Sequence, residues 1–550
     1  MLNKKTKSRM LADACNDRLH SLLKLVTSVA LISLIPNLQA QNAFQWPEGK
    51  RAALSLSFDD ARLSHPEVGL RFFQENEAKV TFYVVPSGMK NHVDAWKQIV
   101  ADGHEIGNHT IYHPCTGNFS WVKEHALETY TLASMRQELL EANFQIQQML
   151  GVTPVSFAYT CGNSFVGRGL NTRSYVPLIA ELFQSGRGWL NESANDPIFA
   201  DMARLHGMEM DGKDFETDIL PLVKAAIQNG SWLLLAGHEI GKGGRQTTRV
   251  AMLEKLIAYA QDPKNGIWLA PVGTVASYVE EKRSNDVAQL KASLRLAATF
   301  DQGYHADMAK GDAQMYGTAS YDPQGDGIAS MIPEEVTLAK EKGRFGHALE
   351  FKRKGKASIF YQSQDNMTYS QTNWSGTISL WLSLDPETDL APGYTDPIQI
   401  TDAGYDDAAF WVDFSNKNPR SFRMGVYGDV TVWNPQKIGP DENPAFNNRL
   451  LPASDRPFAR GKWTHVVVSF SGLNSEKGQA TFYINGKSQG SREITEPFTW
   501  ELDKSKIFLG LSYVGLMDEV AIFDQALSAE EVQSLYLLPE GLNSLINQEN

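Results

Sequence analysis

Two neighbouring aspartates and two closely spaced histidines are the residues of this sequence best suited to catalysis. Asp59 and Asp60 directly follow an apolar, alternating segment that ends at Phe58. His109 and His113 stand four positions apart, in a region that holds three of the chain's 12 histidines within ten residues. On one helical turn this spacing brings both imidazoles to one face, where they can share a divalent ion. Adjacent carboxylates point to different sides, so one can bind the ion while the other stays free as a base.

His238 is a third candidate, because it directly follows the apolar segment 232–236 and Gly237. A histidine at the end of a buried strand can act as a general acid. Taken alone, each element has a plainer explanation: a solvated turn for the aspartates, surface histidines for the pair, and a structural role for His238. The three elements together are much more specific than any one of them.

Short apolar strands and helices alternate from about residue 45 to 279 and must position these side chains. Strands are expected at 54–58, 80–85, 155–159, 232–236 and 267–269, and helices at 95–102, 135–150, 219–229 and 250–262. A capping box at 64–67 is expected to open a further helix through Phe73. This alternation is typical of an α/β barrel or open sheet, whose chemistry lies at the carboxyl ends of the strands.

A second region of different character follows. The helical periodicity stops near residue 283, and a polar segment at 284–292 is expected to link two domains. Between 293 and 540, alternating strands are expected at 377–384 and 463–470, and Asn485-Gly486 predicts a type I′ hairpin turn. Many strands without intervening helices indicate an all-β jelly-roll sandwich. Residues 541–550 are expected to form a tail.

The amino-terminal segment 1–40 has the pattern of a secretory signal peptide, since basic residues precede an apolar run at 22–38. That run is too short and too interrupted for a membrane span, so no span is expected in the mature chain. These features predict an exported protein, periplasmic or extracellular. The formal net charge of -13 over 550 residues leaves no basic surplus for nucleic acid, which is excluded as an expected partner.

Three motifs, in this order and spacing, resemble those of the polysaccharide deacetylases of carbohydrate esterase family 4. The first motif of that family is similar to Ser57-Phe58-Asp59-Asp60, its second to His109-Thr110-Ile111-Tyr112-His113, and its last to Leu235-Ala236-Gly237-His238. The resemblance covers roughly 54–279 and implies a distorted (β/α) barrel that removes acetyl groups from a polysaccharide. It implies that a divalent metal, expected to be zinc, is held by Asp60, His109 and His113. Asp59 would be the general base and His238 the general acid.

The chain departs from that family's pattern in two places. Ala61 stands where the first motif normally ends in glycine, which restricts the backbone turn there. Ala158 stands where the third motif usually carries an arginine, so the group that orients the base is expected to be Arg168 or Arg187 instead. Residues 211–215 faintly resemble a fourth motif, although a surface turn is the expected structure.

Cys115 and Cys161 are the cysteines that remain when the signal segment with Cys15 is removed. An oxidising compartment would allow them to pair, although two free thiols stay an alternative because geometry decides bridging. If the third motif aligns as described, the backbone N–H of Cys161 binds the oxyanion. A thiol hydrolase that uses Cys161 and His238 is a weaker alternative, because it gives the aspartates and the histidine pair no role.

Residues 293–540 resemble laminin-G-like, concanavalin A-type sandwiches. The segments that carry this resemblance are 345–351, 463–465, 483–487 and 517–523. Trp374, Trp411 and Trp433 are candidates to stack on sugar rings, although core packing is the commoner fate of tryptophan. Residues 300–303 and Asp518 are candidates for a calcium site.

The sequence therefore predicts a secreted, metal-dependent deacetylase of an acetylated polysaccharide, acting on N- or O-acetyl groups, with an accessory carbohydrate-binding domain. Two alternatives remain. Ala61 and the missing arginine are also compatible with a carbohydrate-binding or adhesive protein whose barrel has lost activity. Related barrels reuse this scaffold for other chemistry, so hydrolysis of another non-peptide carbon–nitrogen bond is the second alternative.

Overall fold

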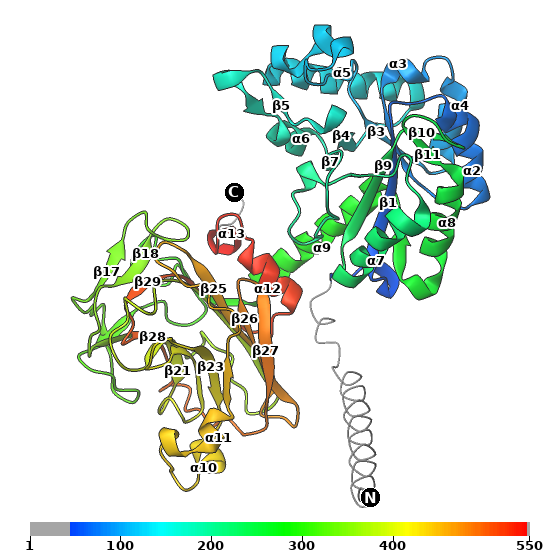
Figure 1. The fold of residues 1–550 in the computed structure, drawn as a ribbon. Helices are drawn as coiled ribbons and strands as arrows, with labels where there is room; N and C mark the ends of the chain where they lie inside the picture. Colours follow the sequence, from blue (N-terminus) through cyan, green and yellow to red (C-terminus); the bar gives the residue numbers. More distant parts are fainter. Residues whose placement is uncertain (1–43, 547–550) are drawn as a thin grey trace, which may run out of the picture. The chain divides into compact units, whose positions relative to one another are not determined.

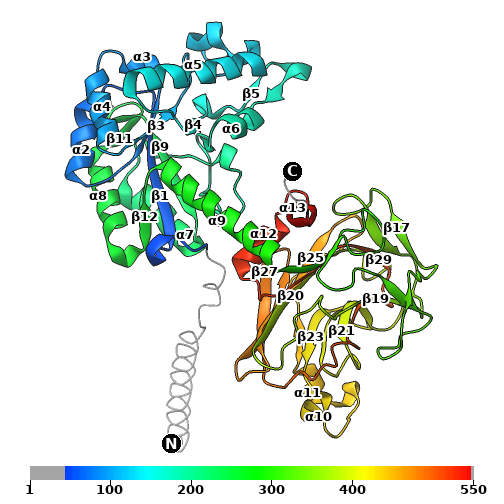
Figure 2. The same ribbon diagram turned by 180° about the vertical axis from the view of Figure 1, so that it is seen from behind.

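The computed structural model describes residues 44–546, which comprise an α/β domain and an all-β domain (Figures 1 and 2). The expected signal peptide, 1–40, lies outside the described residues. Among the helices of residues 44–546, none combines the length and the apolar character that crossing a bilayer requires.

The first domain is built on one curled sheet of eight parallel strands, which confirms the expected α/β fold as a half-barrel. The strand order is β7-β4-β3-β2-β1-β9-β8, and β12 pairs with the first part of β1. The strands are β1 (Ala52–Asp59), β2 (Thr81–Val84), β3 (Glu105–Asn108), β4 (Ser156–Ala158), β7 (Ser185–Arg187), β8 (Met208–Glu209), β9 (Trp232–Gly237) and β12 (Ile267–Leu269). Every residue of the central strands β1 and β9 is buried, as expected of parallel strands covered on both faces.

Helices follow the strands in sequence and cover the sheet (Figure 1). They are α2 (Leu70–Glu75), α3 (Pro86–Met89), α4 (Val93–Ala101), α5 (Leu132–Leu150), α6 (Val176–Leu182), α7 (Leu220–Asn229) and α8 (Val250–Gln261). The capping box predicted at Ser64 is wrong. The Ser64 hydroxyl instead donates to Glu239 and accepts from the backbone N–H of Ile240, because strand β10 (Glu239–Gly241) lies against it.

One long helix, α9 (Val272–Ser293), covers the segment 284–292 that was expected to be a linker. Its first half packs Val275, Ala276 and Val279 into an apolar cluster with Trp232 of β9. Its second half places Leu290 in a different cluster, with residues of the all-β domain. Polar composition alone suggested a linker, whereas apolar residues near both ends of this helix pack into two separate clusters and hold it in place.

The second domain is a sandwich of two antiparallel sheets around a large apolar core, as expected. One sheet contains β13 (Leu294–Ala298), β14 (Met308–Ala309), β17 (Val336–Ala339), β18 (Ala348–Phe351), β20 (Trp374–Ser383), β25 (Thr464–Leu473), β26 (Gly478–Ile484), β27 (Lys487–Ile494) and β29 (Gly515–Phe523). The other has the order β16-β15-β19-β28-β21-β22-β23-β24. Its strands are β15 (Tyr316–Thr318), β16 (Ile328–Ala329), β19 (Ser358–Gln362), β21 (Thr395–Thr401), β22 (Ala409–Phe414), β23 (Phe422–Tyr427), β24 (Leu450–Pro452) and β28 (Lys506–Leu511).

The hairpin turn predicted at Asn485-Gly486 is confirmed. Asn485 and Gly486 have φ of 50° and 75° between β26 and β27, which is the conformation of a type I′ hairpin turn. The end of the chain differs from the expected tail, because α13 (Asn543–Ile546) lies within it. Leu542 and Leu545 are buried in the same cluster as Leu290, and this apolar contact orders the segment.

Candidate active site

The site begins where β1 ends, at Asp59. Asp60 and Ala61 follow with φ of 76° and 52°, so both adopt the left-handed conformation that usually favours glycine. Ala61 therefore takes up the turn despite its side chain. Its neighbour Gly88 makes this possible, since a Cβ atom on residue 88 would lie 2.9 Å from the Ala61 Cβ.

Asp60, His109 and His113 come together as one cluster. The Asp60 Oδ1 atom lies 3.4 Å from His109 Nε2 and 3.3 Å from His113 Nε2. The three candidate ligand atoms lie within 4.8 Å of one another. Burial works to raise the pKa of Asp60, but hydrogen bonds and charge from the two histidines lower it far below its ordinary value.

The expected helical turn between His109 and His113 is wrong, although the two rings do converge, with centroids 4.8 Å apart. The segment after β3 is an irregular loop in which Thr110 and His113 have φ of 67° and 53°. Its shape is set by hydrogen bonds from Thr110 N to Asn108 Oδ1 and from His113 N to Thr110 Oγ1. Glu138 of α5 accepts two further backbone bonds from this loop.

Hydrogen bonds to the far side of the cluster orient its ligand atoms. His109 Nδ1 lies 2.9 Å from the carbonyl oxygen of Ala158, so Nδ1 donates a proton there and Nε2 is the nitrogen that could bind a metal ion beside Asp60. The second oxygen of Asp60, Oδ2, accepts from Arg62 at 2.7 and 3.1 Å. Arg62 was missed from the sequence, because a charged residue in a turn carries no distinctive signal.

The candidate base Asp59 is almost fully buried and is held by Arg187. The Arg187 guanidinium donates to Asp59 Oδ1 from the end of β7, and its side chain is 0% exposed. Burial works to raise the pKa of Asp59, but Arg187 and the nearby His109 and His238 lower it. Of the two arginines expected to replace the missing one, Arg187 makes this contact, whereas Arg168 is exposed.

His238 lies beside Asp60 and is oriented by Asp211. The chain does turn at 211–212 as expected, but Asp211 is buried rather than on the surface. His238 Nδ1 lies 2.7 Å from Asp211 Oδ2, and His238 Nε2 lies 4.0 Å from Asp60 Oδ2. Asp211 is buried, and Thr248 and the backbone N–H of His238 also donate hydrogen bonds to it. The glycine at position 237 is required, since a Cβ atom there would lie 2.2 Å from Thr248 Oγ1.

Two further side chains fix the surroundings of His238. His65 is fully buried, and its Nε2 lies 2.7 Å from the His238 carbonyl oxygen. Burial lowers the pKa of His65 to about 4, so it is a neutral hydrogen-bond donor there. The indole of Trp189 lies edge-on to the His238 ring at 4.9 Å. Burial works to lower the pKa of His238, but the Asp211 hydrogen bond and the charges of Asp59 and Asp60 raise it.

Cys115 and Cys161 form a disulfide, so the alternative of two free thiols and the thiol hydrolase are both wrong. Cys115 Sγ also lies 3.5 Å from His113 Nδ1. The bridge therefore joins the histidine loop to the turn after β4. Cys161 itself has φ of 52° in that turn, and the oxyanion role of its N–H stays a prediction.

The tryptophans singled out in the second domain have different environments. Trp374 is 1% exposed in the core between the sheets, so it cannot stack on a ligand. Trp433 packs beside Tyr427 and donates to a backbone carbonyl. Trp411 lines a pocket on the outer face of the domain.

The residues expected to bind calcium have structural contacts. Asp301 Oδ1 accepts from His347 N, and Asp518 Oδ2 accepts from Arg344 N and Phe345 N, so both carboxylates hold the same loop. Burial and the charge of Glu519 raise the pKa of Asp518 to about 9. Calcium at this place stays a prediction.

The chain therefore has two parts: a curled parallel sheet with histidines and carboxylates at its strand ends, and a β-sandwich that follows it in the sequence. Residues 47–168 match the polysaccharide deacetylase family, and residues 361–533 match the concanavalin A-like lectin/glucanases superfamily. The chain thus contains a polysaccharide deacetylase domain followed by a concanavalin A-like domain.

Similar curated proteins share only parts of the chain. An uncharacterized Bacillus subtilis protein, YlxY, is 33% identical over 94 residues, which are 17% of this chain and 26% of that protein. A gellan lyase from a Bacillus species is 26% identical over 260 residues, which are 43% of this chain and 10% of the lyase. The chain therefore spans about a quarter of the first relative's length and a tenth of the second's.

Two similar solved structures each cover less than half of the chain. A family 4 acetyl xylan esterase from Clostridium thermocellum has 19% identity over 41% of this chain and 91% of its own, with a TM-score of 0.28. Domain 4 of an extracellular arabinanase from Geobacillus stearothermophilus has 17% identity over 44% of this chain and 97% of its own, with a TM-score of 0.29.

Proposed function

We propose that the first domain is a metal-dependent deacetylase that hydrolyses N- or O-acetyl groups of an acetylated polysaccharide. The observation that carries this proposal is the convergence of Asp60 with His109 and His113, where the carboxylate lies 3.3 and 3.4 Å from the two imidazole nitrogens. A base candidate, Asp59, and an acid candidate, His238, flank the same carboxylate.

The donor set fits a divalent ion such as zinc. Two imidazole nitrogens and one carboxylate oxygen are the protein ligands typical of a catalytic zinc site that keeps a position open. His109 is held in the tautomer that leaves Nε2 free, and Arg62 engages only the far oxygen of Asp60. When bound, the ion would acidify a water molecule and polarise the acetyl carbonyl.

Asp59 is placed to act as the base. Its partner Arg187 keeps it ionised and fixed in orientation, so that its other oxygen is available to take a proton from the attacking water. Burial of both side chains keeps their positions fixed through the reaction. Arg187 is a positioning residue in this scheme, since it acts through Asp59.

His238 is placed to act as the acid. The Asp211 carboxylate accepts the Nδ1 proton, which leaves Nε2 directed toward the Asp60 side of the site. A protonated Nε2 would donate its proton to the departing sugar nitrogen or oxygen as the bond to the acetyl carbon breaks. The raised pKa of His238 favours the protonated form that this step needs.

Exposed aromatic side chains beside the cluster support a sugar substrate. The ring of Trp121 is 62% exposed and lies 5.8 Å from the His113 ring, with Phe119 next to it. Tyr112, 57% exposed, stacks on His125 in the same region. Flat apolar faces of this kind suit the C–H surfaces of sugar rings.

Export and a role for the second domain complete the proposal. The basic and apolar pattern of 1–40 supports secretion, to the periplasm or beyond, and the disulfide fits an oxidising compartment. The second domain, which matches a superfamily of lectins and glucanases, would hold the enzyme on its polymeric substrate.

The test is acetate release by residues 41–550 from acetylated xylan, glycol chitin and peptidoglycan, with chelator and after addition of zinc. We expect release from at least one glycan that stops with chelator and returns with zinc. Acetate release that is unchanged by the chelator would contradict metal dependence. The absence of release from every glycan would favour the alternative of an inactive, carbohydrate-binding barrel.

A further inference from the structure

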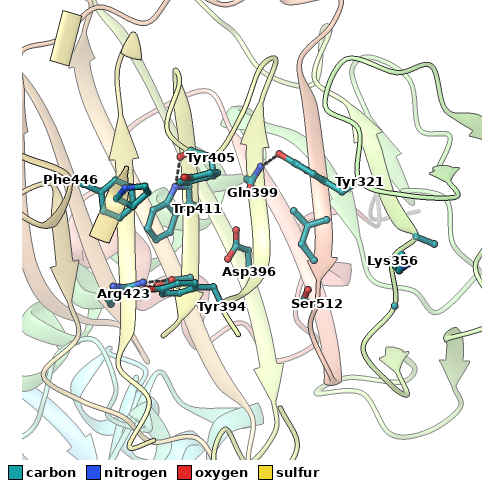
Figure 3. Close-up of a pocket in the computed structure, with 15 residues that line it drawn as sticks. Tyr321, Lys356, Tyr394, Asp396, Gln399, Tyr405, Trp411, Arg423, Phe446 and Ser512 are labelled. Atoms are coloured by element: carbon teal, nitrogen blue, oxygen red, sulfur yellow. Dashed lines mark hydrogen bonds and ion pairs between the residues drawn. The ribbon is translucent and has the colours of Figure 1, made fainter. Parts of the chain in front are cut away.

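A pocket of about 430 Å³ opens on the second domain, on the face of the β21, β22 and β23 sheet that is turned away from the core (Figure 3). Along β22, Phe410 and Val412 point into the core between the sheets, whereas Trp411 and Asp413 line the pocket. The volume lies within the roughly 300–1,000 Å³ usual for small-molecule sites.

Aromatic side chains form much of the pocket. Tyr394 and Tyr405 are 48% and 40% exposed at its rim, and the buried indole of Trp411 forms part of its floor. The indole lies flat over β23 because residue 425 is glycine, since a Cβ atom there would lie 2.3 Å from the ring. Trp411 Nε1 donates to the Tyr405 carbonyl at 2.7 Å, which fixes the ring in place.

One carboxylate in the pocket is unusual. In the part of the chain that the structure describes, the half-buried Asp396 side chain accepts no hydrogen bond, and it lies in the middle of the lining side chains (Figure 3). Asp413, by contrast, is paired with Arg423 directly opposite on β23. Burial raises the pKa of Asp396, and Asp413 adds to this rise while Arg423 opposes it. Because the Asp396 carboxyl group has no protein partner and faces the pocket, it is open to hydrogen bonds with the hydroxyl groups of a ligand.

The described residues that line the interior of the pocket carry little net charge. Arg423 pairs with Asp413, and the raised pKa of Asp396 favours its uncharged form, while the exposed Lys356 lies at the rim. The interior therefore offers no surplus charge to an anionic or a cationic ligand.

We propose that this pocket binds an uncharged sugar unit of a polysaccharide chain, with its ring against the exposed side chains Tyr394 and Tyr405 above the floor that Trp411 helps to form, and two of its hydroxyl groups hydrogen-bonded to Asp396. The combination of flat apolar faces with an open acceptor is what a hydroxyl-rich, otherwise apolar ring requires. This inference rests on the proposed function, which supplies the class of ligand, a glycan. It adds the binding site and the preference of that site for an uncharged sugar.

The experiment is affinity electrophoresis of the full mature chain in gels that contain hydroxyethylcellulose, arabinoxylan or glycol chitin, with polygalacturonate as the charged comparison. We expect at least one neutral polymer to retard the protein, and polygalacturonate to do so at least ten-fold less. Asp396→Asn, which preserves shape, and Trp411→Ala should each weaken retardation at least ten-fold. Tyr316→Ala, a tyrosine of the same sheet that does not line the pocket, should bind as the wild type does.

Three outcomes would overturn the inference: no retardation by any neutral polymer, stronger retardation by polygalacturonate, or unchanged binding in a folded Asp396→Asn variant. Circular dichroism checks that the variants fold. If Trp411→Ala does not fold, the binding of Asp396→Asn alone decides the test. Gel retardation measures binding without catalysis, so the proposed pocket and the proposed deacetylase activity can be contradicted independently. A chain that binds glycan but releases no acetate contradicts the deacetylase, and a chain that releases acetate but is not retarded contradicts the pocket.

Discussion

The carboxylates at the strand ends of the first domain differ in their hydrogen bonding from Asp396 in the pocket of the second domain. In the cluster each acidic group has a dedicated partner: Asp59 is held by Arg187, Asp60 by Arg62, and Asp211 by Thr248. In the pocket, the side chain of Asp396 has no hydrogen-bond partner among the described residues, although Asp413 is paired with Arg423. Groups that transfer protons must be fixed beforehand, whereas a group that recognises a ligand must be left open for it.

The largest expected effect is in the cluster, on the candidate acid. We expect His238→Gln to lower kcat for an acetylated glycan by roughly 10²–10⁴-fold, because the leaving group would depart without a proton. The fall should be much smaller for 4-nitrophenyl acetate, whose leaving group needs no proton. Steady-state kinetics on both substrates measure this, and an equal loss on both would contradict the acid role.

The buried pair should carry the largest effect on stability. Arg187→Gln would leave Asp59 buried without its cation, and we expect the free energy of unfolding of the first domain to fall by about 3–5 kcal/mol. Arg168→Gln is the matched control, because Arg168 is exposed. Chemical denaturation followed by fluorescence compares the two, and similar losses in both variants would contradict the specific role of Arg187.

The disulfide distinguishes the two domains directly. Replacement of Cys115 and Cys161 by serine should reduce the stability of the first domain by about 2–4 kcal/mol, because the bridge closes a long loop in the unfolded chain. Differential scanning calorimetry should show a lower transition for the first domain and an unchanged one for the sandwich. A shift of both transitions would mean that the domains unfold as one unit.

A smaller effect is expected at the residue that orients His238. Asp211→Asn keeps the shape but removes the charge, and we expect kcat to fall about 10–100-fold, as for other partners that orient a reactive histidine. Asp214→Asn is the control, since that side chain is exposed in the same loop and pairs with Arg249. Equal kinetics for the two variants would contradict the pairing of Asp211 with His238.

The smallest effect is expected from the pocket on catalysis. Trp411→Ala should lower the ratio of the rate on a polymeric substrate to the rate on its soluble trimer by a few-fold, because a tethered substrate has a raised local concentration. The same ratio in Tyr316→Ala should match the wild type. A ratio that does not change in Trp411→Ala would separate the pocket from polymer turnover.

Motifs at strand ends explain why much of the site was predictable. Asp59, Asp60, His109, His113 and His238 follow strands whose apolar pattern is visible in the sequence, and parallel strands bring their carboxyl ends to one edge. The alternation of strands and helices predicted the α/β fold, the family resemblance implied a distorted barrel, and the strands without intervening helices predicted the sandwich.

Contacts between distant segments were not predictable in the same way. Arg187 lies 128 positions from Asp59, and only the placement of β7 selects it over Arg168. Asp211 resembled a surface residue because its burial depends on Thr248, 37 positions away. The path between His109 and His113 depends on side chains that bond the loop backbone, which spacing alone does not reveal.

The division of labour between the two adjacent aspartates is the central claim, and metal content measured beside acetate release tests it most directly. In Asp59→Asn we expect about one equivalent of metal per chain, as in the wild type, with acetate release reduced roughly 10²–10⁴-fold. In Asp60→Asn we expect both metal and release to be lost. Loss of metal from Asp59→Asn, or full metal content in Asp60→Asn, would contradict the assignment of base and ligand.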